Sequence, residues 1–171
     1  MKILVTYFSN TGNTEKLGQY IKESLRDQKV DLKPVKDVNP LSLKDYDLVF
    51  LGSGIYASRV NNSLSDLIND AQELPKNFAL FCTHASLTGY QDGFRLVKKA
   101  LKKSDSNILG EFDCMGENIG LSPQTIKSMM ERLPLEKRKE AEEHQKRLKG
   151  RPNQDDLEHA RKFAQSIIKK L

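Results

Sequence analysis

Short segments rich in β-branched and aromatic residues alternate along the chain with segments of helical periodicity. Five strands are predicted, at 2–8, 30–35, 47–52, 77–83 and 107–115. Such alternation is typical of a parallel sheet covered by helices. The first, third and fourth segments are continuously apolar, as strands buried on both faces are, so we expect them in the middle of the sheet.

Apolar stripes at helical spacing predict the covering helices. Leu17, Ile21 and Leu25 recur every four residues and indicate a helix from about Gly12 to Asp27. Two further stripes are Leu64, Leu67, Ile68 and Ala71, and then Phe94, Val97 and Leu101. The last helix is expected to begin at Asn153, whose side chain can cap it, with Asp156 three residues on.

The segment from about 116 to 150 is too long for an ordinary connection between the last strand and the last helix. It predicts a helical insertion of two helices, separated at Pro134. The first has an apolar face of Ile126, Met129, Met130 and Leu133. The second interleaves glutamates with lysines and arginines, which favours a solvated helix over a nucleic-acid surface.

Length and composition restrict the class of protein. The 171 residues fit one domain, 1–171, that includes the insertion. Charged residues make up 30% of the chain, and 28 basic against 23 acidic residues give a net charge of +5. No apolar run approaches the ~20 residues of a membrane span, and no signal peptide is recognisable, so we expect a cytoplasmic protein without a membrane span.

A hydroxyl-rich loop follows the first strand directly and leads into the first helix. It reads Ser9, Asn10, Thr11, Gly12, Asn13, Thr14. A phosphate there would meet unpaired backbone N–H groups, the positive end of a helix dipole and hydroxyl donors. The loop lacks the lysine of a P-loop and the glycine spacing of a dinucleotide loop. These features favour a site for one terminal phosphate, the alternative being a helix cap.

Residues 7–14, Tyr-Phe-Ser-Asn-Thr-Gly-Asn-Thr, resemble the phosphate-binding signature of the flavodoxin family. Residues 46–56, 81–86, 110–116 and 150–163 also resemble segments of flavodoxin-like proteins. The resemblance implies an α/β fold with a doubly wound, five-stranded parallel sheet in the order 2-1-3-4-5. It also implies FMN bound at the carboxyl ends of the strands.

The same resemblance implies that three loops surround the flavin. The loop of residues 9–14 would hold the phosphate. One side of the ring would be approached by Ile55, Tyr56 and Ala57, and the other by Thr83, His84, Ala85 and Ser86. Tyr56 is the main candidate for stacking on the ring, and Tyr90 is a weaker one.

Two charged side chains and two cysteines bear on the redox chemistry. Arg59 and His84 are expected beside the ring, where positive charge would raise the flavin potential above that of acidic flavodoxins. Cys82 and Cys114 end strands that are neighbours in the implied sheet, about within disulfide reach. A redox pair and two small buried hydrophobic residues are the alternatives for these thiols.

The resemblance favours an FMN-binding electron-transfer protein whose partners are redox proteins or a small redox substrate. The alternative is an enzyme, an FMN-dependent quinone reductase or a protoporphyrinogen-oxidase-like oxidoreductase. A third reading is an interaction module without FMN. For the insertion, a substrate lid, a docking surface, a homodimer contact through Met129 and Met130, and a face completing the core all remain open.

Overall fold

Five parallel strands form a single sheet in the computed structural model, which describes residues 1–171. The strands are β1 (Lys2–Phe8), β2 (Lys29–Pro34), β3 (Leu48–Gly54), β4 (Asn77–His84) and β5 (Asn107–Met115). Their order is β2-β1-β3-β4-β5, which confirms the predicted fold and the central position of the three apolar strands. β3 runs two residues beyond its predicted end because Ser53 and Gly54 pair with β4.

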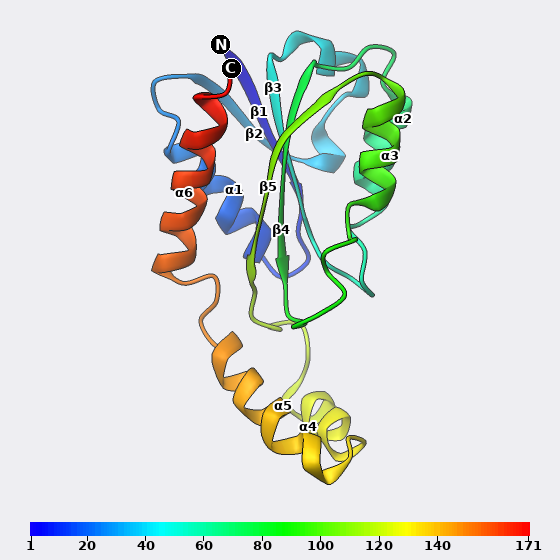
Figure 1. Cartoon of the computed structure of the whole chain (residues 1–171), viewed down its shortest axis with the longest axis vertical. Helices are drawn as coiled ribbons and strands as arrows, with labels where there is room; N and C mark the ends of the chain where they lie inside the picture. Colours follow the sequence, from blue (N-terminus) through cyan, green and yellow to red (C-terminus); the bar gives the residue numbers. More distant parts are fainter.

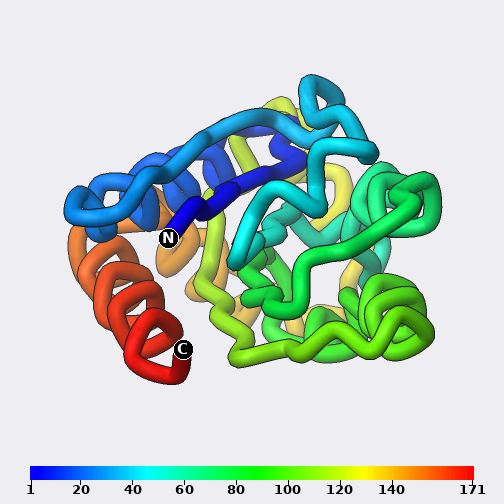
Figure 2. Tube along the Cα trace, turned by 90° about the horizontal axis from the view of Figure 1, so that it is seen from above, coloured from blue at the N-terminus to red at the C-terminus, as the bar shows by residue number.

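Helices cover both faces of the sheet. α1 (Asn13–Glu23) and α6 (Gln154–Ile168) lie on one face, and α2 (Ser63–Asp70) and α3 (Arg95–Lys103) lie on the other (Figures 1 and 2). Short 3₁₀ turns at Val35–Asp37 and Pro40–Asp45 lead into β3. The predicted stripes are buried: Leu17 and Ile21 belong to one apolar core, Leu64 and Val97 to the other. The sheet therefore separates two cores.

Two helix ends show how local chemistry sets the boundaries. α1 stops at Glu23, earlier than predicted, where the Ser24 hydroxyl donates to the Tyr20 carbonyl. Such side-chain bonds compete with continuation of the helix. At α6, the predicted cap is confirmed: Asn153 Oδ1 accepts from the Asp156 N–H, and Asp156 Oδ2 accepts from the Asn153 N–H. This reciprocal pair is a capping box.

The insertion contains the two predicted helices, α4 (Pro123–Glu131) and α5 (Leu135–Leu148). They project from the carboxyl end of the sheet, opposite both chain termini (Figure 1). α4 buries none of its side chains, and Met129 is 55% exposed. The interpretation that this face completes the core is therefore wrong, because the helix lies beyond the end of the sheet. No helix is both long and apolar enough to cross a membrane.

Candidate functional site

The three predicted loops converge at the carboxyl ends of β1, β3 and β4. One pocket there is lined by Thr11 and Asn13, by Ile55 and Tyr56, and by residues 83–85. An adjoining pocket shares Ile55, His84 and Ala85 and adds Ala57, Ser58 and Ser86. Of the predicted residues, Ser9, Asn10, Gly12 and Thr14 belong to the same loop cluster but line neither pocket.

The first loop leaves backbone N–H donors free at the start of α1. Gly12 has φ +83°, a left-handed conformation that glycine adopts without strain, as the sequence suggested. The backbone N–H groups of residues 11–15 donate to no acceptor in the chain. Thr14 is buried, and its hydroxyl lies 2.8 Å from that of Thr83 at the end of β4. Unpaired amides at a helix start, next to buried hydroxyls, provide neutral donors for a phosphate.

Tyr56 leans toward this loop from the end of β3. Its hydroxyl accepts from the Asn10 N–H at 3.1 Å, and its ring meets Phe8 edge-on, with centroids 5.8 Å apart. The chain then turns back on itself through a pair of backbone bonds between Tyr56 and Arg59, of 2.7 and 3.0 Å. At the tip of this turn, Ala57 and Ser58 have φ of 47° and 64°. Two successive left-handed non-glycine residues are strained.

His84 is buried and held by two acceptors. Its Nδ1 lies 2.7 Å from the Ser86 carbonyl oxygen and its Nε2 lies 3.1 Å from Asp113 Oδ2. A carbonyl oxygen and a carboxylate oxygen only accept, so each of these contacts is a hydrogen bond when the ring nitrogen facing it carries a proton. The ring of Tyr90 stacks on this imidazole, with centroids 3.6 Å apart and planes 7° from parallel. The Tyr90 ring therefore packs on the His84 imidazole.

The expected pair of positive charges is separated in the structure. His84 lines the loop cluster, with the Asp113 carboxylate 3.1 Å from its Nε2 atom. Arg59 is exposed and lines a different pocket, beyond the turn at Ala57 and Ser58. Sequence reasoning missed Asp113. In the sheet, Asp113 of β5 pairs with Cys82 of β4, and Cys82 stands two residues before His84. A register argument between these strands would have found it.

The insertion contributes residues that sequence reasoning also missed. Gly116, Glu117 and Asn118 line the first pocket. Asn13 Nδ2 donates to the Glu117 carbonyl at 2.8 Å, and a Cβ on Gly116 would lie 2.7 Å from that Nδ2 atom. A side chain at 116 would displace the Asn13 amide from this hydrogen bond, so glycine at 116 preserves it. From α5, His144 Nε2 lies 2.6 Å from the Ala85 carbonyl oxygen, so it donates to that oxygen.

The hypothesis of a cysteine redox pair is wrong. Cys82 pairs with Asp113 and Thr83 pairs with Cys114 between β4 and β5, so the thiols lie on opposite faces of the sheet. Each belongs to a different core, and both are free. Burial raises the pKa of Cys82 to about 12 and also raises that of Cys114. Both are small hydrophobic residues.

A doubly wound five-stranded parallel sheet in this strand order, flanked by helices, defines a flavodoxin-like protein. The family model for the flavodoxin domain matches residues 4–165. The chain belongs to this family.

Individual proteins agree with this assignment. An uncharacterised protein of Methanocaldococcus jannaschii is 29% identical over 171 residues, which cover 99% of each chain. The crystal structure of oxidised flavodoxin 2 from Bacillus cereus matches the whole of both chains with a TM-score of 0.68 at 20% identity. A flavoprotein of Lactobacillus acidophilus, solved in complex with FMN, matches 66% of this chain and 92% of its own with a TM-score of 0.53 at 15% identity. These structures share the fold.

Proposed function

We propose that this protein binds FMN and transfers electrons between redox partners. The observation that carries the proposal is the set of unpaired amides at residues 11–15, placed beside a pocket at the carboxyl ends of β3 and β4. A phosphate monoester fits these neutral donors, and the pocket beside them suits an attached ring system. Bound FMN would supply reversible electron transfer, and the side chains would supply binding and orientation.

The loops have distinct roles in this proposal. Residues 9–14 would hold the phosphate. One wall of the ring site would come from Ile55, Tyr56 and Ala57, and the other from Thr83, His84, Ala85 and Ser86. Family membership supports the cofactor, as does the FMN complex of the Lactobacillus acidophilus flavoprotein that shares the fold. Partner proteins or a small redox substrate would exchange electrons at the exposed edge of this site.

Fluorescence titration tests the cofactor. Added FMN should be quenched at micromolar protein concentrations. Thr14→Val removes one donor at nearly constant volume and should weaken FMN binding about tenfold. Thr125→Val makes the same change on the exposed surface of α4 and should leave binding unchanged. Fluorescence that stays unquenched in the wild-type protein contradicts the proposal.

An oxidoreductase that reacts with a small molecule is the second candidate. The observation that favours it is the lining of the pocket by Gly116, Glu117 and Asn118, because the start of the insertion then borders the site where a substrate would approach the flavin. Reductive titration separates the candidates: stepwise one-electron reduction indicates electron carriage. Oxidation of NAD(P)H with a quinone, above a control with free FMN, indicates the enzyme.

Charge pairing modifies the expected potential. Asp113 lies 3.1 Å from His84 Nε2, so a positive charge on His84 would raise the flavin potential by less than an unpaired positive charge would. His84→Gln removes a side chain that can carry this charge and should lower the potential by about 20–60 mV, where 59 mV corresponds to ~1.4 kcal/mol for one electron. Potentiometric titration of the FMN-loaded protein measures this shift.

A further inference from the structure

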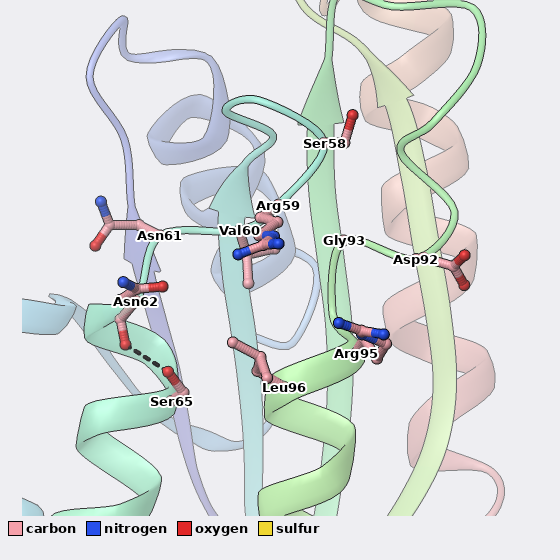
Figure 3. A pocket seen from close by; sticks show the side chains of 10 residues that line it. All are labelled: Ser58, Arg59, Val60, Asn61, Asn62, Ser65, Asp92, Gly93, Arg95 and Leu96. Atoms are coloured by element: carbon pink, nitrogen blue, oxygen red, sulfur yellow. Dashed lines mark hydrogen bonds between the residues drawn. The ribbon is translucent and has the colours of Figure 1, made fainter.

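A separate pocket lies on the α2 and α3 side of the molecule, next to the turn at residues 56–59. It is formed between residues 58–65, which lead into α2, and residues 92–96, which lead into α3 (Figure 3). A backbone bond from the Val60 N–H to the Gly93 carbonyl, of 3.2 Å, joins these two segments. The walls of the pocket are therefore held in place by the fold.

Two arginines of this pocket have no partner in the chain. Neither Arg59 nor Arg95 makes a side-chain hydrogen bond or an ion pair, whereas Arg151 pairs with Asp156 and Arg161 with Glu158. Asp92 is the one acidic residue that lines the pocket, and its carboxylate points away from both guanidinium groups (Figure 3). Two free guanidinium groups at one opening leave an uncompensated positive charge there.

Neighbouring groups strengthen this charge. α3 contains four lysines besides Arg95 and no acidic residue, and one of these lysines, Lys98, pairs with Glu111 of β5 at 2.7 Å. Arg95 itself stands in the first turn of α3, where the helix dipole favours a negative charge. An arginine at this position lowers helix stability, and a binding role would account for its presence.

We propose that Arg59 and Arg95 bind the carboxylate or phosphate group of a small organic anion. Guanidinium groups present paired N–H donors that match two oxygens of such a group. Ser58 lines both this pocket and the second pocket of the loop cluster. The bound group would therefore anchor a redox substrate beside the flavin ring. This assignment of a substrate class rests on the proposed function, whereas the anion site itself does not.

Anion titration of the purified protein tests the site without relying on flavin. Inorganic phosphate and succinate are added in turn to ¹⁵N-labelled protein at low ionic strength, and the Nε–H resonances of arginine side chains are followed. We expect saturable shifts at Arg59 and Arg95. Succinate binding in preference to phosphate identifies a carboxylate site, and the reverse preference identifies a phosphate site.

Variants establish whether the pocket is responsible. Arg59→Gln and Arg95→Gln should each weaken binding at least tenfold, and Asp92→Asn should tighten it about two- to fivefold. Lys103→Gln removes the same charge at the far end of α3, about 12 Å from Arg95 along the helix, and should change binding less than twofold. Equal losses in Arg95→Gln and Lys103→Gln, or no saturable shift, would overturn the proposal.

FMN quenching, measured on the same samples, distinguishes the two proposals. Anion binding that depends on the arginines without FMN quenching leaves the anion site intact and contradicts the flavin function. FMN quenching without anion binding contradicts the anion site alone.

Discussion

Residue by residue, the cysteines show how burial decides chemical behaviour. Both thiols are buried, and desolvation raises the pKa of each, so the reactive thiolate is scarce at neutral pH. We predict that the native protein at pH 8 reacts very slowly with a thiol reagent, before and after treatment with a reductant. In the unfolded protein both thiols should react at once, so two equivalents of reagent should be consumed per chain. A fast-reacting native thiol, or a titre that rises on reduction, would contradict this assignment.

The turn at residues 56–59 carries backbone strain at Ala57 and Ser58, and Ala57 offers the simpler test. Ala57 has φ +47°, which glycine adopts freely and alanine does not. Ala57→Gly should therefore raise the free energy of unfolding by about 1 kcal/mol. Ala71→Gly is the matched control, because Ala71 has φ −74°, and it should lower stability by about 0.5–1 kcal/mol. Urea unfolding of both variants measures the difference, and equal signs would show that the turn is unstrained.

Among the elements, α5 is joined to the loop after β4 through the side chain of His144. His144 donates to the Ala85 carbonyl at 2.6 Å, although α5 is otherwise mostly exposed. His144→Ala should lower the protection from hydrogen exchange of α5 and of residues 83–86. Global stability should fall by about 1 kcal/mol or less, since one hydrogen bond is lost. His159→Ala on the exposed face of α6 is the control, and unchanged exchange in His144→Ala would contradict the role.

Hydrogen bonds join the two ends of the insertion, so the insertion projects from the sheet without interrupting it. The Glu117 N–H donates to the Arg151 carbonyl, and Glu117 Oε2 accepts from the Gly150 N–H at 2.8 Å. Its two ends are thus paired beside the site.

The insertion also leaves three large apolar side chains exposed, those of Ile119, Met129 and Leu135. A contact between two copies of the chain through Met129 and Met130 stays a prediction, which sedimentation analysis would test.

For the whole molecule, buried acids predict a loss of stability in alkaline solution. Burial raises the pKa of Cys82, Tyr7 and Tyr46 to about 12, with bonds to Glu15 and Asp31 also acting on the two tyrosines. Below about pH 8 these groups are protonated in both states, so their contribution is complete. Between about pH 9 and 12 the unfolded chain loses protons that the native protein keeps, and the free energy of unfolding falls.

Urea unfolding at pH 7, 9, 10 and 11 measures this decline. Each group contributes up to about 1.4 kcal/mol per pH unit between its unfolded and native pKa. Cys82→Ala removes one of these groups and should reduce the slope between pH 9 and 11. An identical slope in the variant would assign the decline to other groups.

Hydrophobic periodicity determined much of this protein before any tertiary contact was considered. The five strands, the central position of the apolar ones, the insertion and the Asn153 cap depend on local patterns of burial and hydrogen bonding, which adjacent residues encode. The loop with free amides between β1 and α1 was equally visible, because the strand, Gly12 and the helix start are contiguous.

Tertiary structure alone decided which distant side chains meet. Asp113 pairs with His84, and His144 reaches Ala85, because strand register and the path of the insertion bring them together. Strand register also put Cys82 and Cys114 on opposite faces of the sheet. Cys114 pairs with Thr83, the neighbour of Cys82, and successive residues of a strand point to opposite faces. Arg59 and Arg95 share a pocket for the same reason: their proximity depends on the packing of α2 beside α3, which no local pattern specifies.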